Sequence, residues 1–172
     1  MLAAVLAELD LELLPQALFA RGEPRYAATA ANGDHLFGRL AARSFGALLR
    51  ATYTFTPRLS LQTFAQLFLA ARHYDELSAF TPAGPRPQVH LQDLRYGATA
   101  EVNPDQQEAT FDVNVVLRWE YRMGALLYVV YTRSQSPQLM LAPGQRGALD
   151  FHKVGRGPAA DVVLVKLSYW WG

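Results

Sequence analysis

The sequence predicts an all-β protein: an antiparallel up-and-down transmembrane β-barrel, or the C-terminal segment of a larger barrel, with about eight strands. Apolar and polar residues alternate with a period of two over long stretches, as they do in strands with one apolar side. These stretches run for about 10 to 13 residues, which is nearer to the ~9 to 11 of tilted transmembrane strands than to the ~5 to 6 of soluble ones. Short turns also alternate with long polar loops, as in outer-membrane barrels.

The N-terminal stretch fits two kinds of element. Ala3 to Leu13 alternates, with Glu8, Asp10 and Glu12 on one side, which favours a strand. Leu2 to Leu14 is also rich in Ala, Leu and Glu, which are strong helix formers. A strand and a helix therefore both remain open here.

A hairpin is predicted next. Ala31-Asn32-Gly33-Asp34 is a turn signal between the candidate strands Arg25 to Ala30 and His35 to Ala42. Counting these two segments and Ala3 to Leu13 as strands brings the total for the chain to eight.

The clearest alternation marks three further strands: Phe45 to Thr56, Phe111 to Arg122 and Asp161 to Trp171. In each of them the odd-numbered residues are apolar or aromatic, apart from Asp161 at the start of the last one; most even-numbered residues of the first two are polar, and those of the last include Lys166 and Ser168. Each strand therefore has one apolar side and one mostly polar side.

Two more strands, Leu59 to Arg72 and Ala125 to Ser134, complete hairpins with these. A three-residue loop, Arg122-Met123-Gly124, has Gly where a positive φ is wanted, and it predicts that Tyr121 faces Ala125 and Trp119 faces Leu127. A three-residue loop Pro57-Arg58-Leu59 likewise predicts that Thr56 faces Ser60 and Phe55 faces Leu61. In both hairpins apolar residues then face apolar residues.

Long polar loops are predicted over His73 to Glu108 and Gln135 to Ala159, which are rich in Pro, Gly, Gln and Arg. Short turns at one end of the strands and long loops at the other match the periplasmic and extracellular ends of outer-membrane barrels. The chain of 172 residues is interpreted as one barrel domain or barrel fragment.

Composition excludes several classes of protein. The 16 Lys and Arg nearly balance the 15 Asp and Glu, so no basic footprint for nucleic acid is present. Charged residues make up only 18% of the chain, against about 25% in ordinary soluble domains. The absence of cysteine excludes disulfides and thiolate chemistry, and no apolar run approaches the ~18 residues of a transmembrane helix.

No catalytic or metal-binding pattern is recognisable, so the interpretation is non-catalytic and without cofactor. The four histidines, His35, His73, His90 and His152, lack metal-ligand spacing and are expected to be solvated loop residues. A hydrolase site in the long loops would have to draw on Asp75, Glu76, Asp93 and His152, and no motif aligns these residues.

Three ordered motifs carry a family resemblance: FTPRLSLQTFAQLF at Phe55 to Phe68, VVLRWEY at Val115 to Tyr121 and VKLSYWW at Val165 to Trp171. They resemble the domain-of-unknown-function family 5916, over roughly Phe37 to Trp171. The resemblance implies the C-terminal half of that family's barrel. Family members are typically long bacterial envelope proteins with an N-terminal module resembling a carbohydrate-binding domain, and no sugar-binding or catalytic residue of the family can be transferred to this chain.

Both chain ends bear on export. The N-terminus carries three acidic residues and no basic one, unlike a secretory signal peptide, so an export signal is expected on sequence not included here. The chain ends in Gly172, one residue after Trp171, where the outer-membrane assembly signal typically ends in an aromatic residue. The expected partners are the lipid bilayer of a bacterial outer membrane, its assembly machinery and the remaining strands of a larger barrel.

Two sets of residues are the candidate functional groups. A lumen charge ladder is predicted on the polar sides of the strands, where neighbours about 7 Å apart can pair and tune permeation or plug the lumen; it comprises Arg50, Arg118, Glu120, Arg122 and Lys166. An interfacial aromatic girdle is predicted at the turn ends of the strands; it comprises Tyr53, Phe55, Trp119, Tyr121, Tyr169 and Trp171.

The predicted role is porin-like, in transport or in anchoring. The alternative is a soluble β-sandwich that binds ligands with its long loops. The two differ in what covers the apolar sides of the strands, because a sandwich covers them with a second sheet and a barrel exposes them to lipid.

Overall fold

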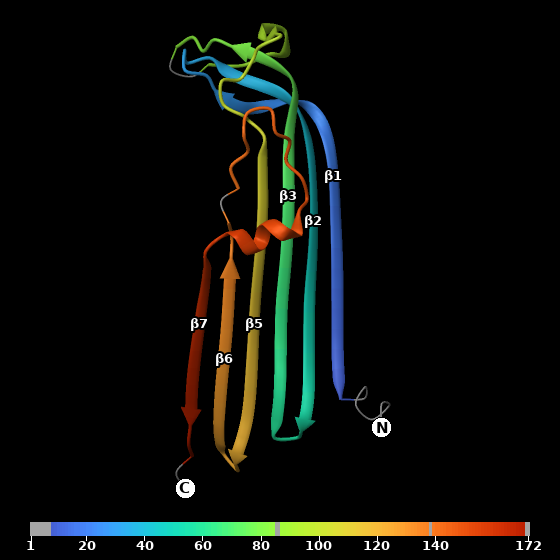
Figure 1. Ribbon diagram of the computed structural model, residues 1–172, viewed down its shortest axis with the longest axis vertical. Helices are drawn as coiled ribbons and strands as arrows, with labels where there is room; N and C mark the ends of the chain where they lie inside the picture. The colour runs from blue at the N-terminus through green and yellow to red at the C-terminus, as the bar shows by residue number, and fades with distance from the viewer. Residues whose placement is uncertain (1–7, 85–86, 138, 171–172) are drawn as a thin grey trace.

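The chain forms one antiparallel sheet (Figure 1), seen in a computed structural model that describes residues 8–84, 87–137 and 139–170. Its strands are β1 (Leu9–Thr29), β2 (His35–Thr56), β3 (Leu59–Phe80), β4 (Arg95–Tyr96), β5 (Gln106–Arg122), β6 (Ala125–Gln135) and β7 (Ala159–Ser168). The spatial order is β1-β2-β3-β5-β6-β7, and the short β4 pairs with the end of β3. Two 3-10 helices, η1 (Leu91–Asp93) and η2 (Phe151–Arg156), lie in the loops. The predicted all-β antiparallel architecture is confirmed.

The sheet is open, with β1 and β7 as its two edges. The described residues therefore do not form the closed barrel that the sequence predicted. They also form a single sheet, so the two layers of a sandwich are not formed within this part of the chain either.

The described residues form seven strands where about eight were predicted, because two predicted pairs of strands are continuous and the short β4 lies in a predicted loop. Arg25 to Ala30 belongs to the 21-residue β1, and His35 to Ala42 joins Phe45 to Thr56 in the 22-residue β2. At about 3.3 Å per residue, a strand of this length measures roughly 70 Å. β1, β2 and β3 are thus about twice as long as a membrane crossing requires, whereas β6 and β7 have about the length of one crossing.

The N-terminal ambiguity is settled only in part. Leu9 to Leu14 lies in β1, so the helix alternative is wrong for these residues. Residues 2 to 7 of this predicted element, and Trp171 at the other end of the chain, lie outside the described residues.

The three predicted hairpins are present, and their registers differ in detail from the prediction. Ala30 to Asp34 connects β1 to β2, with Thr29 opposite His35. The turns at Pro57-Arg58 and Met123-Gly124 contain two residues instead of three, and each is preceded by a bulge residue, Phe55 or Tyr121. Gly124 has the positive φ that was expected (74°).

The bulges explain which pairings were wrong. Trp119 faces Leu127 as predicted, whereas Arg122, not Tyr121, faces Ala125. Leu61 faces Tyr53 instead of Phe55, and Ser60 faces Thr54 instead of Thr56. The shift of two residues between β2 and β3 leaves the side chains above the bulge on their predicted faces, because the side-chain period of a strand is also two.

Both long loops are shorter than predicted. β3 continues through His73 to Phe80, and β5 begins at Gln106. In this upper part the β2–β3 register shifts beside Glu76, whose φ is positive (51°). A Cβ on the opposing Gly38 would come within 2.9 Å of Leu77 and Tyr74, so this tight crossing requires glycine.

Register places the odd-numbered and even-numbered residues on opposite faces across the whole lower sheet. Leu9, Tyr53, Leu61, Leu117, Val129 and Val165 form one continuous cross-strand row. Residues directly opposite in an antiparallel pair share a face. We call the two surfaces the odd face and the even face.

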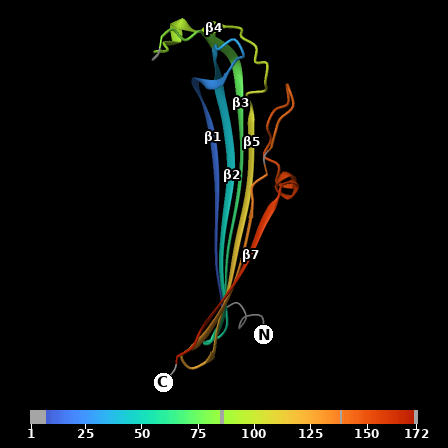
Figure 2. The same ribbon diagram turned by 90° about the vertical axis from the view of Figure 1, so that its left-hand side faces the viewer.

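Only part of the odd face is covered. The segment of residues 139–156 between β6 and β7, here called the strap, lies against one side of the sheet (Figures 1 and 2). Leu69, Ala109 and Val154 form a small buried cluster with Leu67, Phe111, Leu139 and Leu149 packed around it. The lower half of the sheet has no such cover within the described residues.

Candidate membrane-facing surface and its polar boundary

The uncovered part of the odd face is a band without charge. On β1 its members are Leu9, Leu11, Leu13, Pro15, Ala17 and Phe19. The other long strands contribute uncharged odd residues over 47–55, 59–65, 113–119, 127–131 and 163–167. On the edge strands these side chains are largely exposed, for example Leu13 (60%) and Val165 (63%). The band is a large apolar surface of the kind that marks a contact with lipid or another protein.

The lower end of the band is aromatic. Tyr53 and Phe55 meet edge to face with ring centroids 4.6 Å apart, and Trp119 and Tyr121 do so at 6.1 Å. In each hairpin the bulge residue is the second aromatic of the pair, so the bulge keeps both rings together. Tyr169, just after β7, accepts a hydrogen bond from the Arg122 guanidinium (3.2 Å). The structure thus gathers the described members of the predicted girdle at the turn end of the sheet.

The upper end of the band is a polar boundary. The first polar residues above the apolar run are Arg21 on β1, Arg43 on β2, His73 on β3 and Gln107 on β5, which occupy two adjacent cross-strand rows. On β6 and β7 the boundary lies lower, where Arg133 faces Asp161 at 3.7 Å. An oblique boundary is expected where strands are tilted relative to a flat interface.

Residues of the boundary hold the strap to the sheet. The Arg43 guanidinium donates to the Gly147 carbonyl (2.9 Å), and the amide of the buried Gln107 donates to the Ala148 carbonyl. Lys153 Nζ in turn donates to Gln107 Oε1 (2.7 Å). Phe151 contacts the Phe45 ring edge to face at 6.0 Å. The strap therefore covers the upper apolar rows of β3 and β5, and the rows nearer the turns stay bare within the described part of the chain.

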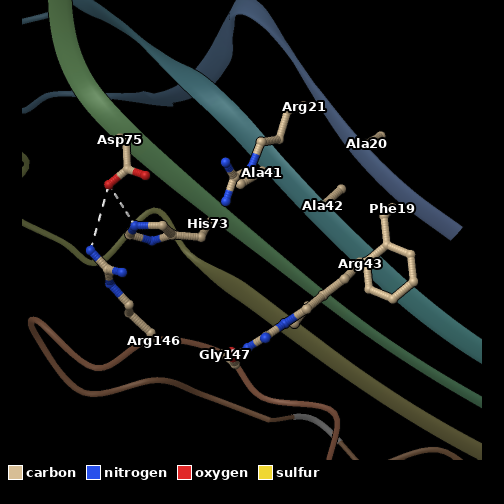
Figure 3. Close-up of a pocket in the computed structure, with 11 residues that line it drawn as sticks. Phe19, Ala20, Arg21, Ala41, Ala42, Arg43, His73, Asp75, Arg146 and Gly147 are labelled. Carbon is tan, nitrogen blue, oxygen red and sulfur yellow. Dashed lines mark hydrogen bonds and ion pairs between the residues drawn. The ribbon is translucent and has the colours of Figure 1, made fainter.

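Beside the strap lies a pocket of about 530 Å³, open toward β1. Figure 3 shows Phe19, Arg21 and Arg43 on the sheet side and Arg146 and Gly147 on the strap side. His73 lies at its upper end, with Nδ1 2.6 Å from Asp105 and Nε2 2.7 Å from Asp75. Asp75 also pairs with Arg146 at 3.6 Å. Asp105 thus contacts His73, and Asp75 contacts both His73 and Arg146.

The even face carries the charges. Its charged members on the lower strands are Asp10, Glu12, Arg50, Asp112, Arg118, Glu120 and Lys166. Arg50 pairs with Glu12 of β1 at 3.2 Å, and Ser134 donates to Asp112 (2.6 Å). Asn114 donates to Thr132 on the neighbouring strand (2.8 Å). Polar ladders thus run along the even face.

The predicted charge ladder is only partly assembled. Arg118 and Lys166 share one row with Tyr128 between them, and Arg50 lies on the same face two strands away. The Glu120 carboxylate accepts from the Gly124 backbone amide at 3.3 Å instead of pairing with its neighbours along the strand. Arg122 lies beyond the bulge and contacts Tyr169. The alternating ladder of acid between two bases is therefore not observed.

A second polar cluster ties the loops together at the upper end of the sheet. Asp34 in the β1–β2 turn accepts from Thr81 (2.6 Å) and from Arg95 of β4 (2.8 Å). The hydrogen bond from Thr81 is the main reason that the pKa of Asp34 is lowered from its usual value, with Asn32 and Arg95 adding to it. Hydrogen bonding at His152 likewise lowers the pKa of Asp150 beside η2.

Sequence reasoning missed the boundary and its pocket. His73 was expected to be a solvated loop residue, and it is a half-buried strand residue held between two carboxylates. Of the loop acids, Glu76 pairs with Arg39 and Asp75 with His73 and Arg146. The usable signal was the first charged residue on the odd side of each strand, which marks where the apolar band stops.

The described residues contain no helix long and apolar enough to cross a membrane. Within the same ranges, no group of three or more His, Asp or Glu side chains has the geometry to hold a metal ion. Comparison with known proteins gives no match to a family model, to a curated protein or to a solved structure. The resemblance to family 5916 therefore rests on the three sequence motifs alone.

Proposed function

We propose that this chain is part of the wall of a bacterial outer-membrane β-barrel, with its odd face toward lipid and its even face toward the barrel interior. The single observation that carries the proposal is the bare apolar band. On β1 it runs from Leu9 to Phe19, which is about 33 Å of strand and about 23 Å of height at a tilt of about 45°. The apolar belt of outer-membrane barrels is about 25 Å tall.

The two ends of the band support the same orientation. Aromatic residues such as Trp119 and Tyr53 gather at one end, as they do at membrane interfaces. Arginine and histidine begin at the other end, where a lipid-facing strand would leave the hydrocarbon. The strap covers the apolar rows of β3 and β5 just below this level.

Closure of the barrel is a further part of the proposal. β1 and β7 are long edge strands that run antiparallel to one another, and their outer edges are unpaired within the described residues. Exposed apolar edges of this length are templates for pairing with other strands, and lipid cannot satisfy their backbone groups. We propose that the remaining strands of a larger barrel pair with both edges and that outer-membrane assembly machinery inserts the whole.

The proposed role is porin-like transport or anchoring, without catalysis. Arg50, Arg118 and Lys166 would line the interior, where charged side chains tune permeation. Conductance across a planar bilayer separates the two roles. Discrete ion-selective steps that change when Arg118→Glu is introduced support transport, and a closed bilayer leaves anchoring.

The orientation is tested with two neighbouring valines of β5. Val115 lies on the odd face and Val116 on the even face, and both are half-buried. An arginine facing lipid at mid-depth costs about 2 to 4 kcal/mol, whereas one facing the interior is tolerated. In refolding of the full chain from urea into phosphatidylcholine vesicles, Val115→Arg is expected to abolish most vesicle-dependent protease protection, and Val116→Arg is expected to retain it.

The soluble sandwich makes the opposite prediction for the wild type. If a second protein layer covered the odd face, the chain would resist protease in plain buffer, and vesicles would add nothing. That result, or equal damage from Val115→Arg and Val116→Arg, would contradict the proposed orientation.

A further inference from the structure

The pocket at the polar boundary holds more positive charge than its carboxylate can match. Three arginines line it, each from a different element: Arg21 of β1, Arg43 of β2 and Arg146 of the strap. Asp75 is the only acidic residue in the lining, and it is already shared by Arg146 and His73. Arg43 bonds a neutral carbonyl, and no partner for Arg21 is recorded among the described residues.

The pocket is continuous with the bare band. Phe19 lies at its mouth and is 79% exposed, and Arg21 is the next odd residue above it on β1. Below Phe19, the odd face of β1 and β2 remains uncharged down to Leu9 and Tyr53. A ligand in this pocket would therefore meet arginine at one end and a long apolar strip at the other.

We propose that this pocket binds the phosphate-bearing headgroup of an anionic membrane lipid, with the acyl chains lying along the odd face of β1 and β2. The inference rests on the proposed function, because it takes the odd face to be lipid-facing, and it adds a specific lipid class. Arginine suits this ligand because its planar guanidinium forms paired, charge-assisted hydrogen bonds to phosphate oxygens. The apolar strip favours a lipid over a free phosphate ion, which would leave that strip unused.

The position of the arginines along the strands also fits a lipid headgroup. The arginines begin where the apolar run of β1 and β2 ends, which is where headgroup phosphates would lie if that run spans the hydrocarbon. The bond from Arg43 to the Gly147 carbonyl also fixes the strap against the pocket. The bound headgroup would thus contact both the sheet and the strap.

The test counts lipid retained by the full chain in nonionic detergent, using native mass spectrometry. Phosphatidylglycerol and phosphatidylcholine with identical acyl chains are compared for the wild type, for Arg21→Gln/Arg43→Gln and for the control Arg25→Gln/Arg58→Gln. The control removes two exposed arginines outside the pocket. We expect the wild type to prefer phosphatidylglycerol by at least about tenfold, which corresponds to about 1.4 kcal/mol, because both lipids present a phosphate and only phosphatidylcholine brings a cation beside the arginines. The preference is expected to vanish in the first variant and persist in the control.

Two further arms keep the result decisive. Arg21→Gln alone removes a side chain without a recorded partner, so it should reduce the preference without disturbing the fold. Inorganic phosphate should fail to displace the lipid. Equal retention of both lipids by the wild type, equal loss in the control, or displacement by inorganic phosphate would overturn the proposal.

Failure of the headgroup site can be distinguished from failure of the proposed function. Dihexanoyl phosphatidylglycerol, used as a monomer in plain buffer, reports on the arginines even if the chain never inserts into vesicles. A chain that inserts with the Val115/Val116 asymmetry but shows no lipid preference keeps the membrane orientation and loses the headgroup site.

Discussion

The upper and lower parts of the apolar odd face contain the same kinds of residue, but among the described residues only the upper part is covered by another segment of the chain. In the lower half, Leu13 and Val165 are largely exposed, and no other part of the described chain covers them. In the upper half, Leu69 and Ala109 are each 1% exposed beneath the strap. The strap covers the odd face of β3 and β5 only in the rows just below Arg43 and Gln107, at the upper end of the apolar run. This difference implies that something outside the chain covers the lower half, and we propose that it is lipid.

The two parts also differ in the contacts that stabilise them. At the boundary, side chains such as Arg43 and Gln107 hold the strap to the sheet. Nearer the turns, strand pairing, the polar contacts of the even face and the aromatic pairs join the strands, with no covering segment among the described residues. The lower sheet is therefore expected to depend on its surroundings for stability, and the upper one on its own packing.

The largest expected effect is on the covered half. Leu69→Ala removes a side chain that is 1% exposed and leaves a cavity, so it should reduce the free energy of unfolding by about 2 to 5 kcal/mol. Leu13→Ala on the bare half should cost less, because lipid or detergent chains fill the space and no cavity remains. Urea titration of both variants in the same detergent measures the difference. Equal losses would show that a rigid protein layer covers Leu13 as well.

A smaller effect is expected from acid at the loop cluster. Because the folded-state pKa of Asp34 is lowered from its usual value of 3.8, its charged form favours the folded state. The contribution is present above that value and is lost as the pH falls below it. Hydrogen exchange around Thr81 and Arg95 should therefore increase as the pH is lowered from 5 toward about 3, beyond the intrinsic pH dependence.

Asp34→Asn supplies the matched control for this pH effect. The variant should show raised exchange already at pH 5 and little further change on acidification. The aromatic end of the lower half lies at the opposite end of the sheet and should show no such response. A response that survives in Asp34→Asn would assign the acid sensitivity to other carboxyl groups.

Much of the sheet could be predicted from alternation alone. The long strands, the turn positions and the division into an apolar and a polar face follow from a period of two, and a register error of two residues does not disturb them. The errors at Phe55 and Tyr121 arose because a two-residue turn with a bulge and a three-residue loop are nearly indistinguishable in sequence.

The boundary pocket could not be predicted in the same way. The strap segment has no alternation, and its position depends on contacts such as Arg43 with Gly147, which are 104 residues apart in sequence. His73 was assigned to a loop because the polar residues that follow it obscure the continuing strand. The gathering of aromatics at the turn end could be predicted because these residues adjoin turns, whereas the contact of Glu120 could not, because a local backbone amide donates to its carboxylate.

The most direct test of the central claim is single-cysteine spin labelling along β5, which is simple because the chain has no cysteine of its own. Labels at Val113, Val115 and Leu117 and at Asn114, Val116 and Arg118 are compared in vesicles for collision with oxygen and with a water-soluble nickel chelate. The account predicts a period of two: the odd positions are accessible to oxygen and shielded from nickel, and the even positions show the reverse. Odd positions shielded from both reagents, in a protein that folds in plain buffer, would contradict it.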